Sequence, residues 1–496
     1  MVGILSIALI LVYNYNFLLF FLNNASSSSR SSSSSSRSSA QQQEQCIVKP
    51  SLVGLREKNS LKVENFVAHG LLFPTSMAFV DDSNILVLEK AGQVRLITNG
   101  ELQKQAILTV PVDNTSERGL LGIAVLKASN SSGGNSGLTA KKNVGLATTT
   151  RTTTIASTTI TATKVFLYFT EANGREPLRN RIYIYDWDSK EHLLLHPKMI
   201  LDVSALPGPN HNGGKLAIGP DNYLYAVIGN VNAGDSILQN DKRGRGPHDT
   251  SVIFRIDPNN DGLPAPKNPI SSSDNNSTTN NILSRYYAYG IRNSFGITFD
   301  PITGSLWDTE NGELAYDEIN LVQPGFNSGW QQVMGPISRS NITVRDLVNL
   351  PGSHYSDPAF SWLTTIGVTD IEFLKSSKLG SRYTNNIFVG DINNGNLYYF
   401  ELNKDRTGLR FGYNSDYDNN EAALLSDFVA DDKAEVSTII FGKGFVGITD
   451  IETGPEDGFL YILSYINGSI YRIVPSSNNN NNSISSDNSN NHIRQH

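Results

Sequence analysis

One short strand pattern recurs six times along this chain, and it constrains the fold more than any other feature. Each copy joins a short apolar segment, a turn of Gly, Asp or Asn, an alternating segment, and a last segment that closes on Arg or Tyr beside an apolar residue. The copies lie at 76–97, 119–187, 213–258, 295–322, 369–402 and 448–474. Period-two alternation is typical of β-strands, and no long segment with the helical period competes with it. A pair of β-sandwiches would not explain a sixfold recurrence, so we predict an all-β, six-bladed β-propeller.

The two ends of the chain do not follow this pattern. Residues 4–22 are almost wholly apolar, so we expect 1–23 to be a signal peptide or an N-terminal membrane anchor. A Ser/Gln-rich stalk follows at 24–50, and an Asn/Ser-rich tail ends the chain at 476–496. Such tracts cannot bury apolar area, so both tails are expected to be disordered. The predicted location is extracellular or at the cell surface, secreted or anchored, with membrane contact only through the N-terminal segment.

A third biased stretch interrupts the second copy of the repeat. Residues 128–163 are Ser/Gly-rich and then Thr-rich. We expect this low-complexity insertion to form a surface loop of the propeller, which we place at 51–475.

The charge balance excludes nucleic acid as a partner. The chain has 40 basic and 47 acidic side chains, so its formal charge is 40 − 47 = −7. A phosphate-binding surface needs a basic excess instead. The lone cysteine, Cys46, excludes an internal disulfide and a thiolate metal cluster.

Propellers bind ligands where their loops converge on the central channel, so polar residues at strand entrances are the candidates for a site. His211 lies among glycines just before an apolar strand, where an imidazole can accept a proton near neutral pH. A structural histidine that bonds its own loop is the alternative. Arg292 and Asn293 precede another strand, and the arginine suits a carboxylate or an oxyanion. An ion pair between blades is the alternative for Arg292.

Two further segments carry carboxylates. Around Gly312 the chain gathers four acidic residues: Glu310, Glu313, Asp317 and Glu318. Carboxylate and carbonyl oxygens at such a turn suit a hard cation such as Ca²⁺, although a solvated acidic loop is the simpler alternative. Glu117 lies at the entrance of a strand in the second copy.

Together these segments resemble a known family. SERGLLGIAV, HNGGKLAIGPDNYLYAVIGN, YGIRNSFGITFD, ENGELAYDEINLVQPGFNSGW and GPEDGFLYIL occur in the order and spacing of the glucose/sorbosone dehydrogenases, the soluble PQQ-dependent aldose sugar dehydrogenases. The resemblance covers about residues 60–474. It implies a six-bladed propeller that holds pyrroloquinoline quinone (PQQ) and Ca²⁺ in its central cleft. It also implies an exported oxidoreductase that oxidises the anomeric hydroxyl of a small sugar to the lactone, with an external electron acceptor.

The resemblance assigns roles position by position. His211 matches the base that takes the proton of the anomeric hydroxyl while hydride passes to the quinone. Arg292 and Asn293 match the pair that contacts the quinone oxygens, and Glu117 stands beside the cofactor. The main-chain carbonyls of two further residues match those that hold the Ca²⁺ ion, and they belong to Gly312 and Glu313.

Three positions depart from the family. Its members carry a lysine where this chain has Asn393, and arginines where it has Gly447 and Thr449. Those cations face the carboxylates of the cofactor, so their absence leaves a second function open. That alternative is a non-catalytic surface propeller that binds carbohydrate or protein. A lactonase or hydrolase that uses only the metal is a more distant third.

Overall fold

The computed structural model describes residues 49–53, 60–128, 162–172, 174, 177–271, 281–411 and 425–476. The predicted leader at 1–23, nearly all of the predicted stalk, and the tail after residue 476 lie outside these residues. So do residues 129–161 of the insertion. The described residues from 49 onwards belong to one compact unit.

The hydrogen-bonded strands of the described residues form six sheets. We number the sheets by the chain order of one strand in each, which we call its first strand: β3, β8, β12, β17, β23 and β28. Sheet 1 contains β3 (Pro74–Phe79), β4 (Asn84–Glu89), β5 (Gln93–Thr98), β6 (Glu101–Leu102) and β7 (Leu108–Thr109). Sheet 2 contains β8 (Leu120–Leu126), β9 (Lys164–Glu171), β10 (Arg179–Asp188) and β11 (Leu193–Ser204). Sheet 3 contains β12 (Leu216–Ile218), β13 (Leu224–Ile228), β14 (Val252–Asp257), β15 (Leu263–Pro264), β16 (Tyr286–Tyr289), β20 (Phe326–Asn327) and β21 (His354–Tyr355).

The other three sheets are completed by strands from distant parts of the chain. Sheet 4 contains β17 (Gly296–Phe299), β18 (Leu306–Glu310), β19 (Asp317–Val322), β22 (Phe360–Trp362) and β26 (Val429–Ala430). Sheet 5 contains β23 (Val368–Phe373), β24 (Ile387–Asp391), β25 (Leu397–Phe400), β27 (Ile440–Lys443) and β1 (Ser51–Leu52). Sheet 6 contains β28 (Ile448–Thr453), β29 (Leu460–Ser464), β30 (Ser469–Pro475) and β2 (Leu61–Val67). The described helices are short: η1 (Ile237–Gln239), η2 (Ile337–Arg339), η3 (Val344–Asp346) and α4 (Lys433–Ile439).

The second strand of each sheet is fully or almost fully buried, because the sheets pack face to face and cover it on both sides. Every residue of β4, β13, β18, β24 and β29 is buried. The apolar core accordingly lies in the seams between sheets. One seam joins Leu86 of sheet 1 to Phe169 of sheet 2, and another joins Trp307 of sheet 4 to Phe373 of sheet 5.

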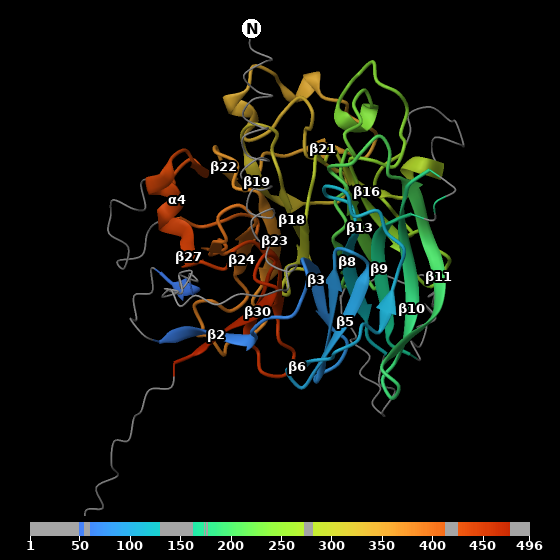
Figure 1. Ribbon diagram of the computed structural model, residues 1–496. Helices are drawn as coiled ribbons and strands as arrows, with labels where there is room; N and C mark the ends of the chain where they lie inside the picture. Colours follow the sequence, from blue (N-terminus) through green and yellow to red (C-terminus); the bar gives the residue numbers. More distant parts are fainter. Residues whose placement is uncertain are drawn as a thin grey trace, which may run out of the picture. The chain divides into compact units, whose positions relative to one another are not determined.

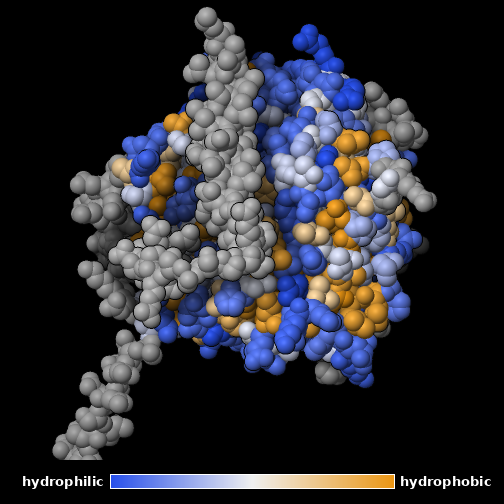
Figure 2. All heavy atoms as spheres, in the orientation of Figure 1, coloured by the Kyte–Doolittle hydropathy of each residue, from blue (hydrophilic) through white to orange (hydrophobic). Residues whose placement is uncertain are grey.

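The first strands of the sheets contact one another in a closed order: β3, β8, β12, β17, β23, β28 and back to β3. Sheet 6 joins the two ends of the fold, because β2 pairs in antiparallel register with β30 (Figure 1). The predicted all-β fold and its propeller arrangement are therefore confirmed. The described surface in Figure 2 mixes hydrophilic and hydrophobic residues, with polar residues in the majority.

Residues 128–163 connect β8 to β9, which are neighbours in sheet 2, and the part described is limited to the two ends of the segment. The part of the predicted location that placed the chain at the cell surface through an N-terminal membrane anchor is overturned. Within the described ranges no helix is long and apolar enough to cross a membrane; the longest, α4, has 7 residues against the ~20 that a span needs.

Candidate active site

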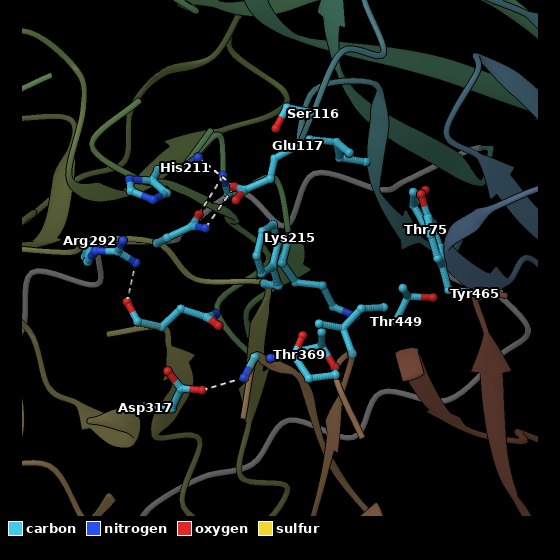
Figure 3. A pocket seen from close by; sticks show the side chains of 18 of the residues that line it. Thr75, Ser116, Glu117, His211, Lys215, Arg292, Asp317, Thr369, Thr449 and Tyr465 are labelled. Atoms are coloured by element: carbon cyan, nitrogen blue, oxygen red, sulfur yellow. Dashed lines mark hydrogen bonds between the residues drawn. The ribbon is translucent and has the colours of Figure 1, made fainter. Parts of the chain in front are cut away.

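A cavity of about 450 Å³ lies where loops and first strands of several sheets converge (Figure 3). Five of the six predicted site residues line it: Glu117, His211, Arg292, Asn293 and Gly312. Four of them sit in the loops that lead into β8, β12 and β17, and the glycine lies in the turn between β18 and β19. Loops at one end of adjacent first strands point into the same channel, so residues far apart in sequence meet there.

His211 is held by its main chain and by one ring nitrogen. Its backbone is in the left-handed region with φ 60°, and its N–H donates to Oε2 of Glu117 at 2.6 Å. Nδ1 lies 2.6 Å from Oδ1 of Asn230, whose Nδ2 donates to the Ala233 carbonyl at 3.1 Å. Because the amide is oriented by that second bond, we assign the ring proton to Nδ1, which leaves the lone pair of Nε2 free.

The imidazole is neutral at physiological pH. Burial, together with the positive charge of Arg292, lowers the pKa of His211 to about 4, and the bond that Nδ1 donates to Asn230 opposes this only in part. A neutral ring with a free Nε2 can accept a proton from a ligand hydroxyl.

Glu117 connects three loops through hydrogen bonds. Its Oε2 accepts from the His211 N–H and, at 3.0 Å, from Nδ2 of Asn293, while Oδ1 of Asn293 accepts from the Gly213 N–H at 3.3 Å. Burial raises the pKa of Glu117. The carboxylate therefore positions the histidine loop and the Asn293 amide relative to each other.

Arg292 faces the cavity without a carboxylate partner. Nη1 donates to the Asn311 carbonyl at 3.0 Å, the guanidinium lies 5.3 Å from the centre of the Trp330 ring, and the main-chain N–H donates to Glu310 at 2.6 Å. Its Nε is buried and has no hydrogen-bond partner among the described residues. An ion pair between sheets, the alternative for this residue, is not found in the described part of the chain. The guanidinium is a fixed cation with a donor left for a ligand.

The turn that carries Gly312 is fixed by a buried carboxylate. Asp317 accepts the Gly312 N–H at 3.0 Å with one oxygen, and with the other it accepts the N–H groups of Ile366, Gly367 and Val368 at 2.8, 2.7 and 3.1 Å. The Glu313 side chain is exposed and does not line the cavity. The carbonyl oxygens of Gly312 and Glu313 accept no hydrogen bond from the described residues, which leaves them able to ligate a cation.

The acidic turn is not a solvated loop. Glu310, Asp317 and Glu318 are buried, and burial raises the pKa of Glu310 to about 7. The described ranges contain no group of three or more His, Cys, Asp or Glu side chains arranged to hold a metal ion. The Ca²⁺ ion thus stays a prediction that depends on main-chain carbonyls.

Sequence reasoning missed the charged group on the floor of the cavity. Nζ of Lys215, the residue just before β12, lies 2.8 Å from Asp370 of β23 and 2.7 Å from Asp450 of β28. The signal was available, because both aspartates occur in the same Thr-Asp-Ile-Glu tetrapeptide, at 369–372 and 449–452. Asn230, which fixes the tautomer of the histidine, was missed because an asparagine in a turn carries no distinctive pattern.

Comparisons with known proteins agree with the fold. A family model described as Glucose / Sorbosone dehydrogenase matches residues 140–472. An uncharacterized protein of Synechocystis is 25% identical over 418 residues, which cover 82% of this chain and 85% of that protein. Aldose sugar dehydrogenase YliI of Escherichia coli is 25% identical over 268 residues, so the match spans 54% of this chain and 60% of that relative.

Solved structures have the same fold. The PQQ-bound form of aldose sugar dehydrogenase from Streptomyces coelicolor superposes with a TM-score of 0.56 at 23% identity, over 84% of this chain and 98% of that one. The apo form of soluble aldose sugar dehydrogenase from Escherichia coli gives a TM-score of 0.57 at 19% identity, over 84% and 99%.

Proposed function

Because the chain belongs to the glucose/sorbosone dehydrogenase family, we propose that it is an oxidoreductase that oxidises a sugar at its anomeric hydroxyl to the lactone. The observation that carries the proposal is the neutral His211 imidazole, with Nε2 free, in the same cavity as the Arg292 guanidinium. Removal of a proton and a hydride from one alcohol needs a base and a group that stabilises the transferred charge. The volume of about 450 Å³ is in the usual range of small-molecule sites.

In this proposal His211 is the catalytic base. Nε2 takes the proton of the anomeric O–H, the C1–H bond breaks with its electron pair, and the C1=O bond of the lactone forms. The pair would leave as hydride to a two-electron acceptor of the quinone class, which Arg292 would face and which an external acceptor would reoxidise. Arg292 stabilises the negative charge that develops there. With a pKa of about 4, the imidazolium returns its proton to solvent readily at neutral pH.

PQQ fits one side of this cavity only. The unpartnered Arg292 Nε and the free Gly312 carbonyl suit a quinone oxygen and a cation. On the other side Asn393 and Thr449 offer no positive charge to carboxylates. A buried carboxylate without a partner costs several kcal/mol. The residues present do not fit the whole cofactor, so the acceptor is proposed by chemical class and no step depends on PQQ.

The fold supports the proposal through the position of the loops. We take the six sheets to be the six blades that the sequence predicts, because their first strands contact in a closed order around the channel. A carbohydrate-binding propeller without redox chemistry is the second candidate. The observation that favours it is that the side chains of Asn393 and Thr449, which line the cavity, are uncharged.

Dye-linked oxidation of aldoses by the purified chain tests the proposal. We expect activity with at least one aldose, and we expect His211→Ala to lower kcat by ~10²–10⁴. His196→Ala is the matched control, because that histidine is exposed on β11 and remote in sequence from the cavity loops. Absence of oxidation with every aldose and quinone tried, from a chain that still binds sugar, would establish the second candidate instead.

A further inference from the structure

One residue type recurs in the cavity lining on the side away from Arg292. Thr75, Thr369 and Thr449 each occupy the second position of a first strand, in β3, β23 and β28. All three line the cavity, and Figure 3 shows Thr75 and Thr449 with Tyr465 on the side opposite His211 and Arg292. We call these three threonines the threonine wall.

Each hydroxyl proton of the threonine wall already forms a hydrogen bond within the protein. Thr369 donates to the Ile448 carbonyl at 2.7 Å and Thr449 donates to the Pro74 carbonyl at 2.9 Å. Thr75 donates to the Leu120 carbonyl at 2.7 Å. Each bond crosses to the neighbouring sheet, from sheet 5 to 6, from 6 to 1 and from 1 to 2. A hydroxyl has one donor and two acceptor positions, so these oxygens can only accept from a ligand.

Two lysines, Lys90 and Lys215, also line the cavity, and both ammonium groups already have partners. Nζ of Lys90 donates to the Asn114 carbonyl at 2.6 Å. Lys215 is bonded to the carboxylates of Asp370 and Asp450, each of which follows a wall threonine in its strand and is fully buried. One ammonium between two aspartates adds no net positive charge. Burial lowers the pKa of Lys215, but the charges of the two aspartates outweigh it and raise that pKa; burial, with the charge of Asp450, raises the pKa of Asp370. Both directions indicate that the group retains its protons.

We infer that the threonine wall accepts hydrogen bonds from the hydroxyl groups of a neutral, polyhydroxylated ligand and does not hold a carboxylate-bearing cofactor such as PQQ. A carboxylate only accepts hydrogen bonds, so against oxygens that also only accept it loses its hydration without replacement. A sugar hydroxyl can donate to each of them. The inference rests on the proposed function only in that the ligand is a sugar.

Calorimetric titration of the full chain with PQQ plus Ca²⁺ and, separately, with glucose and maltose tests the inference. We expect the wild type to bind PQQ with a Kd weaker than ~100 µM. Asn393→Lys should tighten PQQ binding by ~10-fold or more, because an exposed side chain at the rim then supplies the missing cation. Sugar binding should not change in that variant. Low-micromolar binding of PQQ by the wild type, or no gain in Asn393→Lys, would overturn the inference about charge.

The hydroxyls are tested by a matched pair of variants. Thr449→Val keeps the shape but removes the acceptor, so we expect sugar binding to weaken by ~10-fold, whereas Thr449→Ser should retain it. Unchanged sugar affinity in a folded Thr449→Val protein would overturn the inference about hydroxyls, and Thr369→Val gives the same test if that variant does not fold. Sugar binding without oxidation would defeat the proposed function and leave the inference intact.

Discussion

Replacement of Lys215 by methionine should be the most destabilising single change on the floor of the cavity. Methionine keeps most of the apolar stem and removes the ammonium that Asp370 and Asp450 share at 2.8 and 2.7 Å. Asp450 would keep its bonds from Ser76 Oγ and the Met77 N–H, both 2.6 Å, and Asp370 would keep the Ile451 N–H at 2.9 Å. Removal of one partner of a buried ion pair costs about 3–5 kcal/mol, and we expect the free energy of unfolding to fall by an amount in that range.

The loss of unfolding free energy in Lys215→Met should also increase as pH rises. With Lys215 present, the pKa of Asp450 is lowered, so its stabilising effect holds above the unfolded pKa and fades in acid. Without the ammonium, burial raises the pKa of both aspartates. The folded state of the variant then binds more protons than the unfolded state, and it loses stability as pH rises. The deficit measured at pH 8 should therefore exceed that at pH 5.

Urea unfolding at the two pH values, followed by tryptophan fluorescence, measures both effects. Lys198→Met is the matched control, since that lysine pairs with Asp261 on the exposed surface and should cost at most about 1 kcal/mol. Adding Asp370→Asn to Lys215→Met should recover part of the loss. A deficit below about 1 kcal/mol, or one that grows towards acid, would refute the assignment of these charges.

Three further predictions concern the active-site loops. Asn230→Leu should lower kcat by ~10-fold or more with little change in KM, measured by steady-state kinetics, because the tautomer of His211 is no longer fixed; an unchanged kcat would contradict the tautomer argument. The acid limb of kcat/KM should fall near pH 4, where His211 becomes protonated; a limb near pH 6.5 would mean that another group is the base. Asp317→Ala should lower stability by about 1–3 kcal/mol in thermal unfolding, because four main-chain N–H groups lose their acceptor; a Tm equal to that of the wild type would exclude this role.

The six-copy pattern was readable because the second strand of each sheet is short and is buried along all or nearly all of its length. Strand β18 (Leu306–Glu310) shows where such reasoning stops, since its polar residues Asp308, Thr309 and Glu310 are as buried as Leu306. Their burial depends on the neighbouring sheet, which local hydropathy does not register. For the same reason the acidic turn was open to interpretation as a solvated loop.

Sequence by itself determined that the chain is an all-β repeat fold and that His211, Arg292 and Asn293 precede first strands. A strand entrance in a repeat has a fixed place relative to the channel, so equivalent loops converge wherever the repeats close. The type of residue and its place in the repeat were sufficient for that conclusion.

Only the tertiary structure decided the direction of hydrogen bonds and the pairing of charges. β2 meets β30, separated by about 400 positions, and Lys215 meets two aspartates from sheets 5 and 6. The threonine wall faces the cavity with acceptors alone because its protons are bonded to carbonyls of the next sheet. The sequence does not show which partner a hydroxyl or a carboxylate is bonded to. Its chemistry is fixed only when the closed ring of sheets places a particular backbone oxygen or ammonium beside it.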